Sequence, residues 1–223
     1  MIVLPRLYPI LDAGCFPNAL DLITAAEELA LAGATLIQYR NKSSNAGQML
    51  AHARELKRCF SPIEDQNSHP VAQNATRVGH PPMRLIMNDR ADLALAAEFD
   101  GVHVGQEDLL PESVRGIIGP ERWLGVSTHN PEQLAEADET TADYLAIGPV
   151  FATSSKEKPD PVVGLEGVRR ARQLTRKPLV AIGGITRANA ASVIEAGADS
   201  VAVISDLLRE PRKSAEEFFR ILR

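Results

Sequence analysis

Apolar and polar positions alternate along the chain in a way that predicts strands and helices in regular succession. Short runs rich in Val, Ile and Leu recur, and each is followed by a segment with apolar residues at helical spacing. The predicted strands cover 6–12, 34–40, 85–88, 102–104, 124–127, 144–150, 178–183 and 200–205, and the predicted helices cover 19–32, 46–60, 91–99, a short stretch from 111, 131–137, 165–174, 188–196 and 214–222. Runs this apolar are typical of parallel strands that are buried on both faces.

This succession predicts an α/β protein with a (β/α)8 TIM barrel, formed by residues 1–223 as a single domain. A doubly wound open sheet is the alternative, but this many units in 223 residues favour closure. Residues 61–83 do not fit the plan, because they hold four prolines, show no period and are too long for an ordinary connection. Since this segment follows a helix and precedes a strand, we expect an irregular insertion on the face opposite the active site.

Composition and charge exclude several classes of protein. The net charge of −5 and the lack of a basic run argue against nucleic acid or an anionic membrane as the main partner. No apolar run approaches the roughly 20 residues that span a bilayer, and the first residues show no basic leader or cleavage pattern. Cys15 and Cys59 have no CxxC spacing and indicate neither a disulfide scaffold nor a zinc site. We therefore expect a cytoplasmic protein.

Acidic residues follow two neighbouring strands of the predicted barrel. Asn88 and Asp89 end one strand, and Asp108 follows the next. The carboxyl ends of parallel strands meet at one rim, where barrel enzymes hold their active sites. Two carboxylates there suggest a Mg2+ site that carries a phosphorylated substrate. The alternative is that these residues cap helices or close turns.

The second and middle strands carry further polar residues. Period two places Gln38 and Arg40 on one face of their strand, and Arg40 with Lys42 would suit a phosphate. A solvated strand end is the alternative there. His103 is predicted to be a buried, hydrogen-bonded residue rather than a base or a ligand. Ser127 is either a lining residue or a helix cap.

Two loops are predicted to bind phosphate groups. Residues 148–156 (GPVFATSSK) combine hydroxyls with a terminal Lys156, which would supply positive charge. Gly184 and Ser205 follow the last two strands, whose loops form the recurrent phosphate site of barrels. A site for two anionic groups suggests a transferase that joins two phosphorylated halves. His129 stays undecided between a functional and a merely exposed residue.

Together these motifs resemble the thiamine phosphate synthase family. The matching pieces are QYRNK at 38–42, ND at 88–89, GVHVGQED at 101–108, GPVFATSSK at 148–156, AIGGI at 181–185 and IS at 204–205. The resemblance extends over nearly all of the chain outside 61–83. It implies a barrel enzyme that couples 4-amino-5-hydroxymethyl-2-methylpyrimidine diphosphate to thiazole phosphate, or its carboxylated form. The implied reaction is a dissociative, Mg2+-assisted substitution that yields thiamine phosphate and pyrophosphate.

The resemblance also implies roles for individual residues. Those matched to substrate binding are Gln38, Arg40, Lys42, Asn88, Ser127, Thr153, Ser155, Lys156, Gly184, Ile204 and Ser205. The catalytic set is Lys156, Arg40 and Ser127, and the Mg2+ ligands are Asp89 and Asp108. Within this set, Lys156 contacts the pyrophosphate, and Ser127 lies beside the pyrimidine.

Two residues differ from the usual pattern of the family, and two alternative functions stay open. Ser155 stands where the family more often has Thr, and Ala152 stands where Pro is common. A thiazole tautomerase-like paralogue would keep the thiazole phosphate pocket but would not need Asp89, Asp108 and Lys156 as a set. A non-catalytic barrel that binds a phosphorylated ligand would show no turnover. The expected partners are small phosphorylated substrates, and the pattern leaves a homo-oligomer open.

Overall fold

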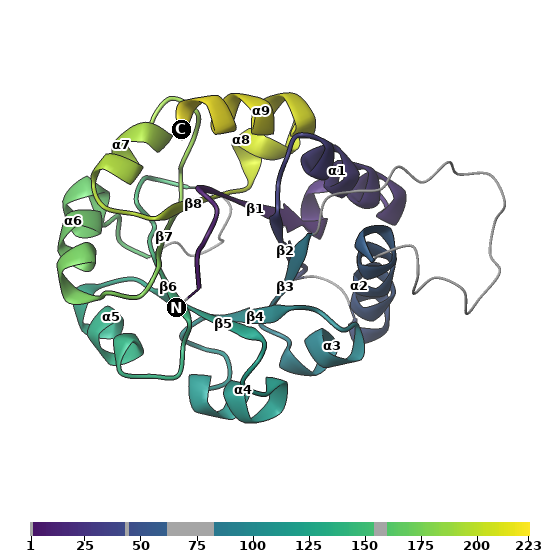
Figure 1. Cartoon of the computed structure of the whole chain (residues 1–223), viewed down its shortest axis with the longest axis horizontal. Coiled ribbons are helices and arrows are strands. Elements are labelled where there is room, and N and C mark those ends of the chain that lie inside the picture. The colour runs from purple at the N-terminus through teal and green to yellow at the C-terminus, as the bar shows by residue number, and fades with distance from the viewer. Residues whose placement is uncertain (1, 43–44, 62–82, 154–159) are drawn as a thin grey trace, which may run out of the picture.

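A computed structural model describes residues 2–42, 45–61, 83–153 and 160–223. Within these residues, eight parallel strands pair in chain order into a closed barrel, and helices surround it (Figure 1). The predicted (β/α)8 barrel is therefore confirmed. The strands are β1 (Leu7–Asp12), β2 (Leu36–Arg40), β3 (Arg84–Asn88), β4 (Gly101–Val104), β5 (Trp123–Thr128), β6 (Tyr144–Ile147), β7 (Leu179–Ile182) and β8 (Ser200–Val203).

Helices follow the strands, and three of the α-helices begin at an asparagine that caps their first turn. They are the 3-10 helix η1 (Ala13–Cys15) and the α-helices α1 (Ala19–Leu31), α2 (Ala46–Phe60), α3 (Ala91–Ala96), α4 (Pro111–Ile118), α5 (Pro131–Asp138), α6 (Gly164–Leu174), α7 (Ala190–Glu195), α8 (Ser205–Leu208) and α9 (Pro211–Ile221). Asn18, Asn45 and Asn130 each accept a hydrogen bond from the backbone N–H three residues later. Such caps satisfy N–H groups that lack a partner within the helix.

The clearest differences from the predicted elements lie at β6 and in the last part of the chain. The strand predicted over 144–150 ends at Ile147, and the strand predicted over 200–205 ends at Val203. The short helix α8 was not predicted, because Ile204 continues an apolar run and hides the end of the strand. Helix α9 begins at Pro211 rather than at 214, with proline in its first turn, where a missing N–H costs little.

Two separate apolar clusters hold the barrel together. One lies between the barrel and the helices and takes Ile37 and Tyr39 from β2. The other fills the inside of the barrel and takes Leu36 from the same strand, as the alternation of strand side chains requires. The inner cluster is made of Leu4, Tyr8, Ile10, Leu36, Ile86, Tyr144, Ala146, Val180 and Ala202.

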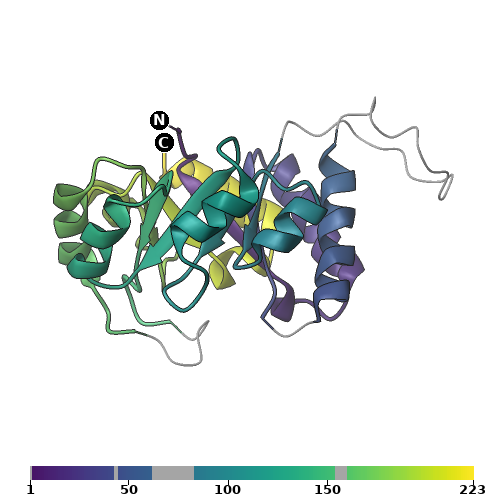
Figure 2. The ribbon, with the colours of Figure 1, turned by 90° about the horizontal axis from the view of Figure 1, so that it is seen from below.

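The two ends of the barrel differ. Both chain termini lie at the end where the strands begin (Figure 2). Ser61 follows α2 and Met83 precedes β3, so they too lie at this end. Residues 62–82 lie outside the described part, and the insertion expected over 61–83 therefore stays a prediction. No helix of the described residues is long and apolar enough to cross a membrane.

Candidate active site

The carboxyl ends of the strands surround a cavity of about 660 Å3. This volume is typical of a site for a small molecule. The predicted site residues in its lining are Gln38, Arg40, Lys42, Asn88, Asp89, Asp108, Ser127, Thr153, Gly184, Ile204 and Ser205. Ser155 and Lys156 lie outside the described residues. The fold thus brings together every predicted site residue that the structure describes.

Asp89 and Asp108 lie together at the ends of β3 and β4. Asp89 has a φ of 63°, a left-handed conformation that is uncommon outside glycine and often marks functional sites. Asp108 accepts a 2.7 Å hydrogen bond from the Gly105 N–H. Burial and the neighbouring Asp89 carboxyl raise the pKa of Asp108, whereas the Gly105 N–H and Lys42 act in the opposite direction. Such crowding of two acids is relieved when a cation binds between them.

The acidic pair fits Mg2+ better than it fits a capping role. Asp89 does not cap α3, because the N-cap of this helix is Arg90, which makes no side-chain capping bond. The Asp89 carboxylate pairs instead with Lys42 Nζ at 2.5 Å. The capping alternative is therefore wrong for Asp89, although Asp108 does close a turn through Gly105. No group of three or more His, Cys, Asp or Glu able to hold a metal occurs among the described residues. Mg2+ is commonly held by one or two carboxylates together with substrate phosphates, which matches this pair.

Arg40 and Asn88 face the same cavity but differ in their hydrogen-bond partners within the protein. Arg40 is half-buried and pairs with Asp12, its neighbour on β1, so its anionic partner is supplied within the protein. Asp12 lies at the end of its strand, the same position that singled out Asp89, and sequence reasoning missed it. Asn88 is buried, and its Nδ2 makes no hydrogen bond with any of the residues that the structure describes. A buried donor without a partner costs about 1–3 kcal/mol, which a ligand oxygen in the cavity would recover.

A chain of hydrogen bonds crosses the inside of the barrel, and four of its five members line the cavity. It joins Gln38, Tyr8, Tyr144, His103 and Ser127 in that order. The prediction that His103 is a buried, hydrogen-bonded residue is confirmed. Ser127 lines the cavity and does not cap a helix, because Asn130 caps α5. Sequence reasoning missed the two tyrosines, since their strands were interpreted only as apolar runs.

Because His103 is buried, we expect the free energy of unfolding of the protein to fall at acid pH. Burial lowers the pKa of His103 to about 4, and the Asp108 charge acts against this only in part. A histidine of the unfolded chain has a pKa of about 6.5. The unfolded state therefore binds the proton first, so the stability that neutral His103 contributes is present above about pH 6.5 and is lost as the pH falls toward 4, by about 3 kcal/mol.

Urea unfolding at about pH 7 and about pH 5 measures this effect. His103→Gln removes the titrating group, so its stability should fall less between the two pH values than that of the wild type. Equal losses in both proteins would contradict the assignment.

The loops after β7 and β8 form the second half of the cavity. Gly183 and Gly184 have φ values of 97° and 64°. A Cβ on Gly184 would lie 2.5 Å from the Ala152 carbonyl oxygen, so the loop after β6 approaches too closely for a side chain. The Gly184 carbonyl accepts a 3.1 Å hydrogen bond from Asn189 Nδ2. Ser205 begins α8 and lines the same cavity as Gly184. This is the recurrent arrangement for phosphate in barrels, with a short extra helix after the eighth strand.

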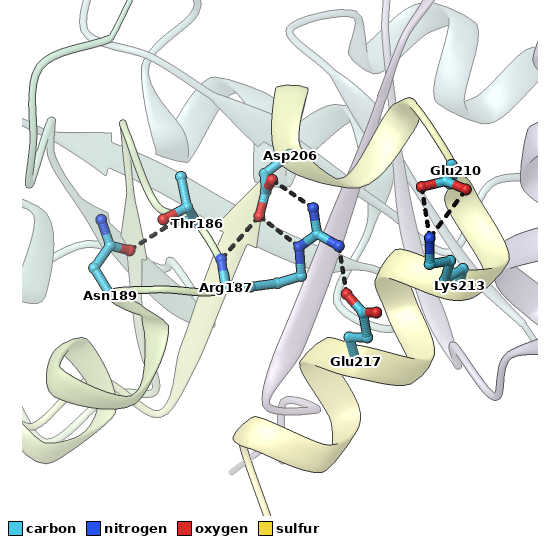
Figure 3. Close-up of polar contacts among 7 residues, drawn as sticks. All are labelled: Thr186, Arg187, Asn189, Asp206, Glu210, Lys213 and Glu217. Atoms are coloured by element: carbon cyan, nitrogen blue, oxygen red, sulfur yellow. Dashed lines mark hydrogen bonds and ion pairs between the residues drawn. The ribbon is translucent and has the colours of Figure 1, made fainter.

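Arg187 ties these two loops together (Figure 3). Its backbone N and Nε donate to Asp206 Oδ2 at 2.8 and 3.0 Å, and a third bond joins its guanidinium to Oδ1 at 3.0 Å. Arg187 also pairs with Glu217 of α9. Burial would raise the pKa of Asp206, but the bonds from Arg187 hold this pKa below its usual value. The loop after β7 is thereby fixed against α8 and α9.

His129, which the sequence left undecided, lines the cavity as well. Its Nδ1 lies 2.6 Å from the Gly148 carbonyl oxygen and must donate the proton there. Its Nε2 lies 3.5 Å from Asp160 Oδ2. Through these two contacts His129 connects the end of β5 to the loop after β6.

Comparisons with known proteins identify the family of the chain. The profile of a family described as thiamine monophosphate synthase matches residues 7–207. A thiamine-phosphate synthase of Koribacter versatilis (strain Ellin345) is 57% identical over 222 residues, which cover 98% of this chain and 96% of that protein. One of Chloroflexus aurantiacus (strain ATCC 29366 / DSM 635 / J-10-fl) is 42% identical, covering 90% and 83%. The solved thiamine phosphate pyrophosphorylase from Pyrococcus furiosus is 30% identical, with a TM-score of 0.78 over 97% of this chain and 95% of that one.

Proposed function

The chain belongs to the thiamine monophosphate synthase family, and on this premise we propose that it is a transferase joining a pyrimidine diphosphate to a thiazole phosphate with the help of Mg2+. The pyrimidine substrate is 4-amino-5-hydroxymethyl-2-methylpyrimidine diphosphate, and the products are thiamine phosphate and pyrophosphate. The thiazole substrate is thiazole phosphate or its carboxylated form.

One observation carries the proposal. Asn88, whose amide donor bonds to no described residue, lines one cavity together with the Asp89–Asp108 pair and Lys42. The donor and the ammonium suit phosphate oxygens, and the acidic pair suits the cation that accompanies a diphosphate. The glycine loop after β7 and Ser205 suit a second phosphate.

Asp89 and Asp108 would hold the Mg2+. When bound, the metal neutralises negative charge on the departing diphosphate. Arg40, Lys42 and Asn88 add donors to the same leaving group, which stabilises the charge that develops as the C–O bond breaks. The thiazole nitrogen that captures the resulting pyrimidine-methyl cation carries no proton. A general base is therefore unnecessary, which agrees with a His103 whose two ring nitrogens are both bonded within the protein.

A direct assay tests the proposed function. The purified protein is mixed with both substrates, with and without Mg2+, and thiamine phosphate is detected by mass spectrometry. We expect product only with Mg2+. A thiazole tautomerase-like protein would isomerise a thiazole substrate and form no coupled product, and a barrel that only binds phosphorylated ligands would bind both substrates without turnover. Absence of thiamine phosphate under both conditions would contradict the proposal.

Lys156→Ala is expected to lower turnover about 10- to 100-fold, because a charged donor to the leaving group is worth about 1.5–3 kcal/mol. Binding of thiazole phosphate should change much less. Steady-state kinetics with each substrate varied in turn measures both effects, and Lys177→Ala is the control, since Lys177 bonds to the Thr140 carbonyl away from the cavity. Turnover of Lys156→Ala close to that of the wild type would remove Lys156 from the proposed site.

Further proposals concern the setting of the enzyme. We propose small phosphorylated molecules as its partners, without nucleic acid or membrane, and the cytoplasm as its compartment. The net charge of −5 supports the lack of a polyanionic partner. A homo-oligomer stays a prediction.

A further inference from the structure

The hydrogen-bonded chain inside the barrel connects two residues of the cavity that lie on different strands, Gln38 of β2 and Ser127 of β5. We propose that its inner members, Tyr8, Tyr144 and His103, are positioning residues that fix which cavity group donates and which accepts a hydrogen bond. In this arrangement Ser127 donates to the ligand, and the Gln38 carbonyl oxygen accepts from it. The inference rests on the proposed function for the identity of the ligand ring.

Four contacts make up the chain. Gln38 Nε2 donates to Tyr8 Oη at 3.1 Å, and the Tyr8 and Tyr144 hydroxyl oxygens lie 2.8 Å apart. Tyr144 Oη lies 3.1 Å from His103 Nδ1, and His103 Nε2 lies 2.8 Å from Ser127 Oγ. Gln38, Tyr8, Tyr144 and His103 are buried at 7% exposure or less, so bulk water does not compete for these bonds.

Because Gln38 Nε2 donates at the first contact, counting protons gives every later bond of the chain its direction. A hydroxyl and a neutral imidazole each carry a single N–H or O–H proton. Because Tyr8 accepts from Gln38, its own proton goes to Tyr144, and the Tyr144 proton goes to His103 Nδ1. The imidazole proton is then on Nε2 and is donated to Ser127. The Ser127 proton is left to point toward the cavity, which its side chain lines.

The same count of protons applies to Gln38, at the other end of the hydrogen-bonded chain. The Gln38 side chain lines the cavity, and its Oε1 accepts no hydrogen bond from the described residues. The orientation of the Gln38 amide, with Nε2 on Tyr8, therefore sets both ends of the chain: Oε1 accepts from the ligand and Ser127 donates to it. The count takes His103 as a neutral ring, which is buried and held between the hydroxyl groups of Tyr144 and Ser127.

A glycine makes the central contact of the chain sterically possible. A Cβ on Gly125 would lie 2.2 Å from Tyr144 Cζ and 2.4 Å from His103 Nδ1. Gly125 pairs with both of their strands, lying opposite His103 on β4 and Tyr144 on β6. The missing side chain therefore lets the two rings approach to 5.5 Å between centroids across an intervening strand.

This polarity selects an aminopyrimidine edge. A ring nitrogen next to an exocyclic amino group offers an acceptor for Ser127 and a donor for Gln38. An analogue with an oxo group in place of the amino group, and a proton on the ring nitrogen, offers the reverse pattern. A site with fixed polarity rejects such an analogue, because buried polar groups would then face each other without a bond.

The test compares the amino and oxo forms of the pyrimidine diphosphate in the wild type, in Tyr144→Phe and in a control. Tyr144→Phe keeps the ring and cuts the chain between Tyr8 and His103. We expect the ratio of kcat/KM for the two forms to fall by 10- to 100-fold in Tyr144→Phe, with the KM for thiazole phosphate unchanged. Tyr39→Phe is the matched control, because Tyr39 is also fully buried and hydrogen-bonded but lies outside the barrel interior. Its ratio should equal that of the wild type.

A second measurement does not depend on turnover. In 15N-histidine NMR of the wild type, the His103 signals, assigned by their loss in His103→Gln, should show a protonated Nε2 and an unprotonated Nδ1. A protonated Nδ1 in the wild type, or an unchanged ratio in a folded Tyr144→Phe, would overturn the inference. Failure of the wild type to make thiamine phosphate would overturn the proposed function alone, because the NMR result still tests the direction of the chain. If Tyr144→Phe does not fold, Tyr8→Phe cuts the chain one bond earlier and serves in its place.

Discussion

Asp108→Asn is expected to lower Mg2+-dependent turnover by roughly 10²- to 10³-fold. The change removes one of the two carboxylates that would hold the cation, and loss of stabilised leaving-group charge costs about 3–4 kcal/mol in comparable sites. Asn keeps a carbonyl oxygen that can still accept the hydrogen bond from the Gly105 N–H. The turn after β4 should therefore survive, and the loss should come from the metal rather than from the fold.

Two measurements distinguish a weakened metal site from a disturbed fold. Mg2+ titrations of turnover should show that Asp108→Asn needs much more metal, and calorimetry of Mg2+ binding in the presence of pyrophosphate should show the same weakening without turnover. Asp92→Asn is the matched control, since Asp92 is an exposed acid on α3 that pairs only with Arg90 in the described structure. Wild-type turnover and Mg2+ dependence in Asp108→Asn would exclude Asp108 as a metal ligand.

The position of the acidic pair could be predicted because it depends only on the order of elements. Parallel strands that follow each other in a barrel place their carboxyl ends side by side, so Asp89 and Asp108 had to meet. The same rule placed Gln38, Ser127 and Gly184 at one cavity. None of these predictions required a side-chain conformation.

Specific partners could not be predicted, because they depend on register and on closure of the barrel. Arg40 pairs with Asp12 only because the two residues lie opposite each other on β1 and β2. Tyr8 and Tyr144 meet across the interior, from strands that are not neighbours in the sheet. Each lies in an apolar run, and an apolar run gives no sign that its hydroxyls bond to each other.

The boundary of α8 was missed for a related reason. Hydrophobic periodicity distinguishes a strand from a helix only over several residues, and α8 has four. What fixes α8 is a contact distant in sequence, the bonds from Arg187 to Asp206. Short elements at a functional end of a barrel are thus set by tertiary contacts rather than by local pattern.

Gly184→Ala is expected to destabilise the protein by about 3 kcal/mol and to lower kcat/KM for thiazole phosphate by roughly 10²- to 10³-fold. A left-handed conformation costs a residue with a Cβ about 1–2 kcal/mol, and a clash in a packed region adds about 1–3 kcal/mol. Both apply here, since φ is +64° and the new Cβ would lie 2.5 Å from the Ala152 oxygen and 2.8 Å from Phe151 Cβ. Relieving the clash must move the loop after β6 away from the proposed phosphate pocket.

Substitutions at two other glycines distinguish the backbone strain in Gly184→Ala from its steric clash. Gly164 has nearly the same φ, +65°, but its Cβ would meet no atom of the described residues within 4 Å, so Gly164→Ala should show only the strain of about 1–2 kcal/mol. Gly116 lies in α4, and a Cβ there would meet no atom within 4 Å in the part of the chain that the structure describes, so Gly116→Ala should be neutral or stabilising. Urea unfolding and kinetics with thiazole phosphate varied measure the series. If Gly184→Ala lost no more stability than Gly164→Ala and bound thiazole phosphate normally, the close approach of the two loops would not be what shapes this pocket.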